Sequence, residues 1–184
     1  ADTYSSCSGA TTVCAPSSEP FRDSDQAHTV AGTFQLTLER MLAANPDLIV
    51  IQPHGFTQLT GDPDLVMSNG TRLTPDPDYL VELRERLIRQ DSSLTIKIVH
   101  MDPGWDRLAG TTNTQGRLIN GSPDPCGSNA TGATGRFLHI EQAFDGLRDT
   151  EASWHKLARA IAGTIPEACC VMRGDANGDG RILV

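Results

Sequence analysis

The chain has 184 residues, a formal net charge of −8 and 38% hydrophobic residues. This length is enough for one domain with a real core and short of two. The acidic balance argues against nucleic acid or an anionic membrane as a partner, and no apolar run approaches the ~18 residues that span a bilayer.

The first part of the chain predicts an irregular segment followed by a helix and a strand. Residues 1–27 carry Ser, Thr, Gly and Pro without periodicity. Residues 30–44 follow a helical pattern that ends at Asn45-Pro46, and a strand at residues 48–52, apolar over its first four residues, leads to His54. The inward face of the helix would carry Val30, Phe34, Leu38, Met41 and Leu42.

The middle of the chain alternates long loops with single elements. Residues 57–75 read as a polar loop, and Asp76 is expected to cap a helix that runs to about Gln90. A strand at 94–100 precedes a second loop, 102–135, which is rich in Gly and Pro. Loops of this length in a compact domain are usually functional.

A strand at 136–142 and a helix capped by Asp149 or Thr150 complete the pattern, with Trp154 and Leu157 expected to face inward. Helices that alternate with apolar strands predict an α/β fold with three layers, in which helices cover both sides of a small, mostly parallel sheet. Ligands in such folds bind where strands end and loops begin.

The cysteines point to an oxidising compartment. Five cysteines lie in polar, turn-rich sequence, and none has the spacing of a zinc site. We expect Cys7 to pair with Cys14, and Cys126 with Cys169 or Cys170. The chain is therefore expected to be secreted.

The C-terminal tail carries a calcium-loop pattern. Asp175, Asn177 and Asp179 supply side-chain oxygens at loop positions 1, 3 and 5, Gly180 allows the sharp turn, and Arg181 supplies a carbonyl. The segment resembles the first loop of dockerin type I repeats. The acidic ligand at position 12 would fall two residues beyond Val184. We therefore expect weak calcium binding, unless a carboxylate from elsewhere in the chain or from a neighbouring chain completes the site.

Two histidines are candidate zinc ligands. His54 follows a buried strand and faces a long loop, and His28 precedes the first helix. Taken by itself, a histidine in this position more commonly hydrogen-bonds the backbone of a loop than binds a metal.

The strand at 136–142 places His139 and Glu141 on one face and apolar residues on the other. An ionisable face on a central strand is costly unless it is functional, whereas on an edge strand it could simply face water. In the preceding loop, Asn113 and Arg117 could hold a carboxylate.

These pieces together resemble the zinc carboxypeptidase and amidohydrolase group that includes poly-γ-glutamate hydrolases, over roughly residues 25–160. The resemblance implies that His54 binds zinc, that Glu141 is the catalytic carboxylate with Arg148 after it, and that Asn113 and Arg117 bind the substrate carboxylate.

The chain departs from that group in one motif. The His-x-x-Glu or His-x-x-Asp pair that supplies the first metal ligands is missing, as are the strands expected before residue 25. Either the chain is the C-terminal part of a longer hydrolase, or the scaffold has lost its chemistry.

The expected organisation is an irregular segment (1–27), a hydrolase-like α/β domain (28–168) and a calcium-loop tail (169–184). The first functional hypothesis is a secreted zinc-dependent amide hydrolase. The alternative is a non-catalytic extracellular module that binds copies of itself, or another extracellular protein, through calcium and its C-terminal segment.

Overall fold

A computed structural model describes residues 26–165. Its elements, in chain order, are η1 (Gln26–His28), α1 (Thr33–Ala44), β1 (Val50–Gly55), β2 (Leu65–Ser68), α2 (Tyr79–Gln90), β3 (Ile96–Ile98), α3 (Thr114–Ile119), β4 (Phe137–Gln142) and α4 (Glu151–Thr164). Within residues 26–165, no helix combines the length and the apolar character that crossing a membrane requires.

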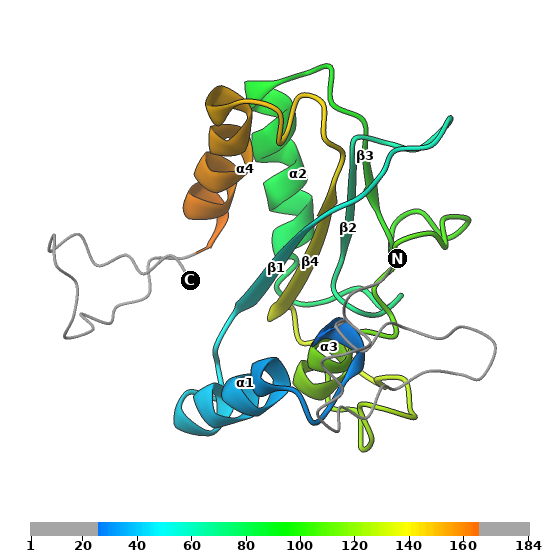
Figure 1. The fold of residues 1–184 in the computed structure, drawn as a ribbon, viewed down its shortest axis with the longest axis vertical. Coiled ribbons are helices and arrows are strands. Elements are labelled where there is room, and N and C mark those ends of the chain that lie inside the picture. Colours follow the sequence, from blue (N-terminus) through cyan, green and yellow to red (C-terminus); the bar gives the residue numbers. More distant parts are fainter. Residues whose placement is uncertain (1–25, 166–184) are drawn as a thin grey trace, which may run out of the picture.

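The strands form one sheet in the order β1-β4-β2-β3 (Figure 1). β1 pairs with β4, and β2 with β3, in parallel, while the central pair β2 and β4 is antiparallel. The predicted α/β class and the mostly parallel sheet are confirmed.

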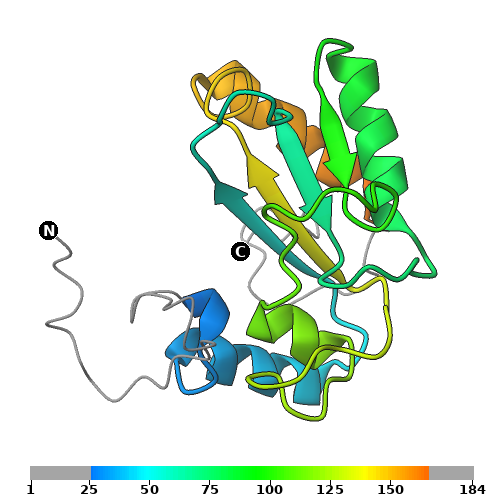
Figure 2. The same ribbon diagram turned by 90° about the vertical axis from the view of Figure 1, so that its right-hand side faces the viewer.

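One face of the sheet is apolar and packs on two helices. α2 and α4 lie together on this face, as the two perpendicular views show (Figures 1 and 2). Because side chains alternate along a strand, every second residue of the sheet joins this layer. Its buried side chains are Leu65, Met67, Leu80, Leu83, Leu87, Ile98, Leu138, Ile140, Leu147, Leu157 and Ala160.

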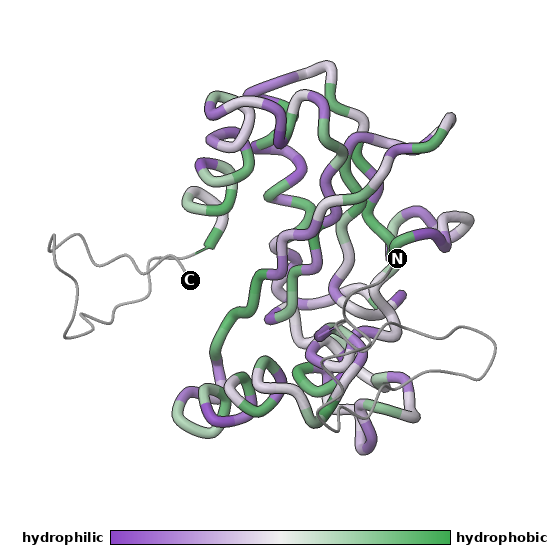
Figure 3. The backbone as a smooth tube through the Cα atoms, viewed as in Figure 1, coloured by the Kyte–Doolittle hydropathy of each residue, from purple (hydrophilic) through white to green (hydrophobic). Residues whose placement is uncertain are grey.

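The opposite face has a small apolar cluster near the amino ends of β1 and β4. Leu38 of α1 and Ile119 of α3 pack there against Phe137 of β4. The apolar run at residues 48–51, which leads from α1 into β1, is visible as a green stretch of the tube (Figure 3). Beyond this cluster, towards the carboxyl ends of β1 and β4, the same face becomes polar.

Two elements lie inside segments that were expected to be loops. β2 occupies part of the predicted 57–75 loop, and all four of its residues are buried. A strand buried on both faces shows no alternation of polar and apolar residues, so periodicity does not reveal it. α3 has only six residues and lies in the predicted 102–135 loop, where Asn113 caps it by accepting a hydrogen bond from the Gly116 amide.

The start of α2 was also predicted wrongly. The Asp76–Pro77 peptide bond is cis, and both residues precede the helix. Asp78 is the cap, and its side chain accepts hydrogen bonds from the amides of Leu80 and Val81. At α4, Thr150 is the cap, as one of the two predictions had it.

Several apolar residues that were expected to face the core are exposed. Phe34 and Met41 of α1 are 52% and 41% exposed, and Trp154 of α4 is 56% exposed. Trp154 has a polar reason to stay at the surface, since its indole nitrogen donates a hydrogen bond of 2.7 Å to the Arg148 carbonyl. A helical pattern in the sequence identifies an apolar stripe along the helix, but which residues of that stripe are buried depends on the elements that pack against the helix.

Candidate functional site

The register of β1 against β4 brings three titratable side chains onto one face. His54 is the Cα partner of Glu141, and Gln52 is the partner of His139. Partners in adjacent strands share a face, so all four side chains lie on the polar side of the sheet. β4 lies between β1 and β2, which excludes the edge-strand explanation for its ionisable face.

The three titratable side chains line a cavity of about 430 Å³. His54, His139 and Glu141 form its floor, and His28 comes from the segment before α1. Residues 106–113 supply most of the remaining lining. His54 and Glu141 therefore face one cavity, and His28 joins them there.

The two strand histidines pack against each other. The ring centroids of His54 and His139 lie 4.8 Å apart, at an interplanar angle of 41°. Nε2 of His139 is 3.5 Å from Oε1 of Glu141, which is too long for a strong hydrogen bond. Nδ1 of His139 is buried and has no hydrogen-bond partner among the described residues.

Burial changes the protonation of this pair. Burial, reinforced by the nearby imidazoles of His54 and His28, lowers the pKa of His139 to about 3. Burial raises the pKa of Glu141 to about 7, although the charges of Arg107 and Arg148 oppose the shift. At neutral pH, His139 is therefore neutral and Glu141 exchanges its proton readily. The contact between them is not a salt bridge under these conditions.

The wall formed by residues 106–113 has unusual backbone geometry. Leu108 has a φ of 59°, in the left-handed region that residues other than glycine rarely adopt, and Gly110 has a φ of 64°. A Cβ on Gly110 would lie 2.9 Å from Nδ1 of His139, so the backbone here approaches the imidazole more closely than a side chain would permit. Strained backbone of this kind occurs often at functional sites.

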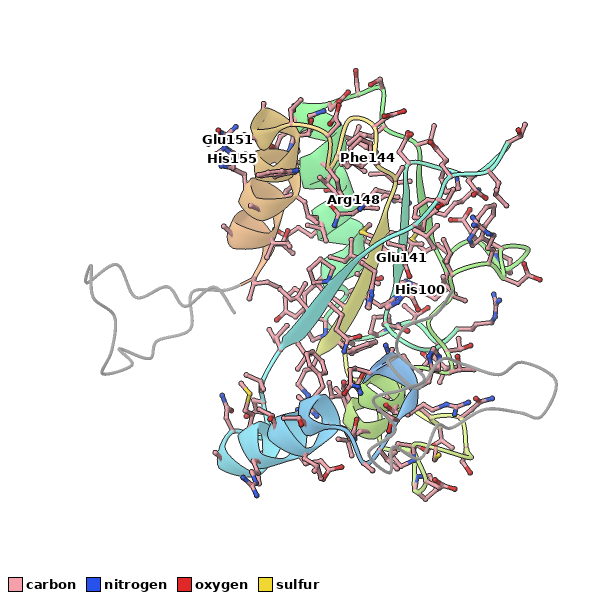
Figure 4. The ribbon with its side chains drawn as sticks, viewed as in Figure 1. His100, Glu141, Phe144, Arg148, Glu151 and His155 are labelled. Atoms are coloured by element: carbon pink, nitrogen blue, oxygen red, sulfur yellow. The ribbon has the colours of Figure 1, made fainter. Side chains whose placement is uncertain are left out.

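The charges of Arg107 and Arg148 act on Glu141, and both arginines make contacts with other groups. Arg107 pairs with Asp62 and lies over the ring of Phe56, with 5.5 Å between the guanidinium carbon and the ring centroid. Arg148 donates to the Ala143 carbonyl at 3.2 Å and lies 5.6 Å over Phe144. In Figure 4, Arg148 and Phe144 lie at the turn after β4, above Glu141. The resemblance pointed to Arg148; nothing in the sequence pattern pointed to Arg107.

The predicted carboxylate-binding pair is arranged differently from the expectation. Asn113 lines the cavity, but its side chain is only 1% exposed, accepts from the Gly116 amide and donates to Gln52. Arg117 points into its own loop, where its guanidinium donates to the carbonyls of Thr111 and Cys126. Arg117 does not line the cavity. Both side chains therefore make hydrogen bonds within the protein, in place of the ligand contacts that were expected.

The donor types in the cavity match those that zinc takes. Neutral imidazole and carboxylate are common zinc ligands, and His139 keeps an unpartnered buried nitrogen. Within residues 26–165, however, no three His, Cys, Asp or Glu side chains are close enough together to form a ready metal site. The imidazole and carboxylate groups of the cavity are of the types that bind zinc, but they would have to move closer together to bind it.

The remaining predicted residues lie outside the part of the chain that the structure describes. These are the calcium-loop residues Asp175, Asn177, Asp179 and Arg181, and the cysteines at 7, 14, 169 and 170. The calcium site, the disulfide pairing and the secreted location stay predictions.

His139 is the site residue that received no role from the sequence. The alternation along residues 137–142 placed it on the face of Glu141, and that pattern is the signal from which its position follows.

Comparisons of this chain with protein-family models, curated proteins and solved structures find no match.

Proposed function

We propose that the cavity between β1, β4 and residues 106–113 is the active site of a zinc-dependent amide hydrolase. The observation that carries the proposal is the meeting of His54, His139 and Glu141 on one polar face, in a cavity of about 430 Å³. A carboxyl whose pKa lies close to neutral pH, next to a neutral imidazole, is typical of an acid–base site.

His54, His139 and His28 would hold the metal, and zinc would supply polarisation of the amide carbonyl. Because the pKa of His139 lies at about 3, its ring nitrogen carries a lone pair, rather than a proton, throughout the neutral range. The three imidazoles belong to β1, β4 and the segment before α1, so zinc binding would join parts of the chain that are far apart in sequence.

Glu141 would carry the protons of the reaction. As a carboxylate it takes a proton from water while the oxygen of that water bonds to the amide carbon. The C–N bond then breaks, and Glu141 returns the proton to the leaving amine. A pKa of about 7 suits both transfers, because the acid and base forms are then present in similar amounts at neutral pH.

Zinc titration and amide hydrolysis test the proposal in the same protein. Calorimetry with zinc is expected to show one site, lost in His54→Ala and His139→Ala and kept in Glu141→Gln. Release of amine from N-acyl amino acids and γ-glutamyl peptides is expected to be abolished by all three substitutions, because each removes a metal ligand or the proton carrier.

His155→Ala is the matched control. His155 is exposed on α4, on the outer surface of the molecule in Figure 4, and does not line the cavity. This variant should bind zinc and turn over as the parent does. A parent chain that binds no zinc, or whose zinc site survives loss of both His54 and His139, would overturn the proposal. Calcium binding alone would favour the assembly module instead.

A further inference from the structure

Four carboxamide side chains form a connected buried group beside the cavity, here called the amide relay. Its members are Gln35 of α1, Gln52 of β1, and Asn113 and Gln115 at the start of α3. Each is between 0% and 6% exposed. Buried amides are costly unless both their donors and their acceptors are satisfied, so a relay of four imposes one arrangement on the elements that it joins.

The relay first ties β1 to α3. Oε1 of Gln52 accepts a hydrogen bond of 2.8 Å from Nδ2 of Asn113, and Nε2 of Gln52 donates to Oε1 of Gln115 at 3.1 Å. Gln52 lies two residues before His54 on the same face of β1, and it is the Cα partner of His139. The start of α3 is therefore placed relative to the strands that carry both histidines.

The relay then reaches the segment before α1. Nε2 of Gln115 donates to Oε1 of Gln35 at 3.0 Å and to the carbonyl of Gln26 at 2.9 Å. The hydroxyl of Thr114 lies 3.2 Å from the carbonyls of Ala27 and of Thr29. These three carbonyls flank His28 on both sides, so the first turn of α3 holds the backbone that carries His28.

His28 reaches the cavity from this anchored backbone. Its Nε2 lies 2.9 Å from the hydroxyl of Thr112, and its imidazole is close enough to contribute to the lowered pKa of His139. We propose that Gln115 and Thr114 are positioning residues that hold His28 in the cavity, and that Gln52 sets their position relative to the strands that carry His54 and His139.

A role of Gln115 and Thr114 in catalysis rests on the proposed function. Their effect on the position of His28 does not. Gln115→Met keeps nearly the same volume and removes the donor to the Gln26 carbonyl. Thr114→Val removes the hydroxyl with little change of shape, and Thr114→Ser restores it. Each substitution removes a side-chain donor that ties α3 to the backbone carbonyls of Gln26, Ala27 or Thr29, which favours displacement of residues 26–29.

Imidazole NMR of zinc-free protein tests the positioning directly. Long-range ¹H–¹⁵N spectra at pH 8, assigned with single His→Gln variants, resolve the five histidines. Gln115→Met and Thr114→Val are expected to shift or broaden the His28 signals, with a smaller effect on His139. Signals of His100 and His155 should not move, and Thr114→Ser should restore the parent His28 signals.

Gln90→Met is the matched control, because Gln90 also bridges two elements, by donating to the Lys156 carbonyl, but lies between α2 and α4. It should leave His28 unchanged. If Gln115→Met does not fold, Thr114→Val and Thr114→Ser decide the outcome. Folded variants with unchanged His28 signals would overturn the proposal.

Zinc calorimetry then separates this proposal from the proposed function. If both hold, Gln115→Met weakens zinc binding by about 10-fold, the smaller end of the range for losing a group that orients a metal ligand, because Gln115 acts on His28 through the backbone of Gln26. If the His28 signals shift but the parent binds no zinc, the positioning stands and the hydrolase proposal fails. If zinc binds equally well to the parent and to Gln115→Met, and the His28 signals do not shift, the positioning fails and the hydrolase proposal stands.

Discussion

Gly110 lies with its backbone against the imidazole of His139, and a Cβ at this position would fall 2.9 Å from Nδ1. The same glycine has a φ of 64°. The close approach closes one wall of the cavity over a neutral, buried ring. Two separate effects, backbone strain and steric contact, therefore oppose any side chain at position 110.

Gly110→Ala should lower the free energy of unfolding by about 2–5 kcal/mol, from strain of roughly 1–2 kcal/mol at positive φ and overpacking of roughly 1–3 kcal/mol. Chemical denaturation measures the change. Gly61→Ala isolates the first effect, since Gly61 has a φ of 91° with no atom within 4 Å of the added Cβ. That variant should lose only about 1–2 kcal/mol. Equal losses in the two variants would argue against the contact with His139.

Glu141 and His139 should make opposing contributions to the pH dependence of stability in zinc-free protein. The pKa of Glu141 is raised in the folded state, to about 7, so its contribution to stability is present below pH 4.5 and is lost as the pH rises to 7. The pKa of His139 is lowered to about 3, so its contribution is present above pH 6.5 and is lost as the pH falls. Between pH 4.5 and 6.5 the two slopes oppose each other.

Single substitutions should uncover each slope. Relative to the parent, the free energy of unfolding of Glu141→Gln should rise from pH 4.5 to 7, by up to about 1.4 kcal/mol per pH unit. The free energy of unfolding of His139→Gln should fall relative to that of the parent as the pH rises from 3 to 6.5. Urea denaturation at several pH values, with chelator present, measures both. Differences from the parent that stay constant with pH would contradict the burial-shifted pKa values.

Arg117 is expected to stabilise the 111–129 loop and not to bind a ligand. Its guanidinium donates to the Thr111 and Cys126 carbonyls at 3.1 and 3.0 Å, and to Oδ1 of Asn129 at 2.7 Å. Lysine lacks the fork of donors, so Arg117→Lys should lose about 2 kcal/mol of stability and increase hydrogen exchange across the loop. Arg159→Lys, at an exposed position on α4, should change stability by less than about 0.5 kcal/mol. A loop that exchanges no faster in Arg117→Lys would show that the clamp is unimportant.

Calcium binding by the tail remains a prediction of the sequence. Calorimetry of the whole chain should show binding in the range of roughly 10⁻⁴–10⁻³ M, because three side-chain oxygens and one carbonyl leave sites for water. Asp179→Ala should abolish the heat, whereas Asp145→Ala, at an exposed position of the described domain, should not. Light scattering with and without chelator reports assembly. Tight binding by a monomer would indicate an acidic ligand elsewhere in the same chain.

Local patterns in the sequence were sufficient for the α/β class and for the strand that carries the site. Period-2 alternation in residues 137–142 placed His139 and Glu141 on one face, because side chains of a strand alternate whatever it pairs with. The apolar run before His54 likewise identified β1. These predictions depend only on near neighbours in sequence, and the structure confirms them.

Tertiary pairing decided the rest. That β4 is central, and that His54 is the partner of Glu141, depends on contacts between segments more than 70 residues apart. Asn113 and Arg117 are polar residues in a loop, and their sequence is compatible with ligand binding or with internal hydrogen bonds. Only their packing shows that Asn113 bonds to Gln52 and Arg117 to its own loop. A polar side chain shows its chemistry in the sequence, but whether it remains available to a ligand depends on which groups the fold buries against it.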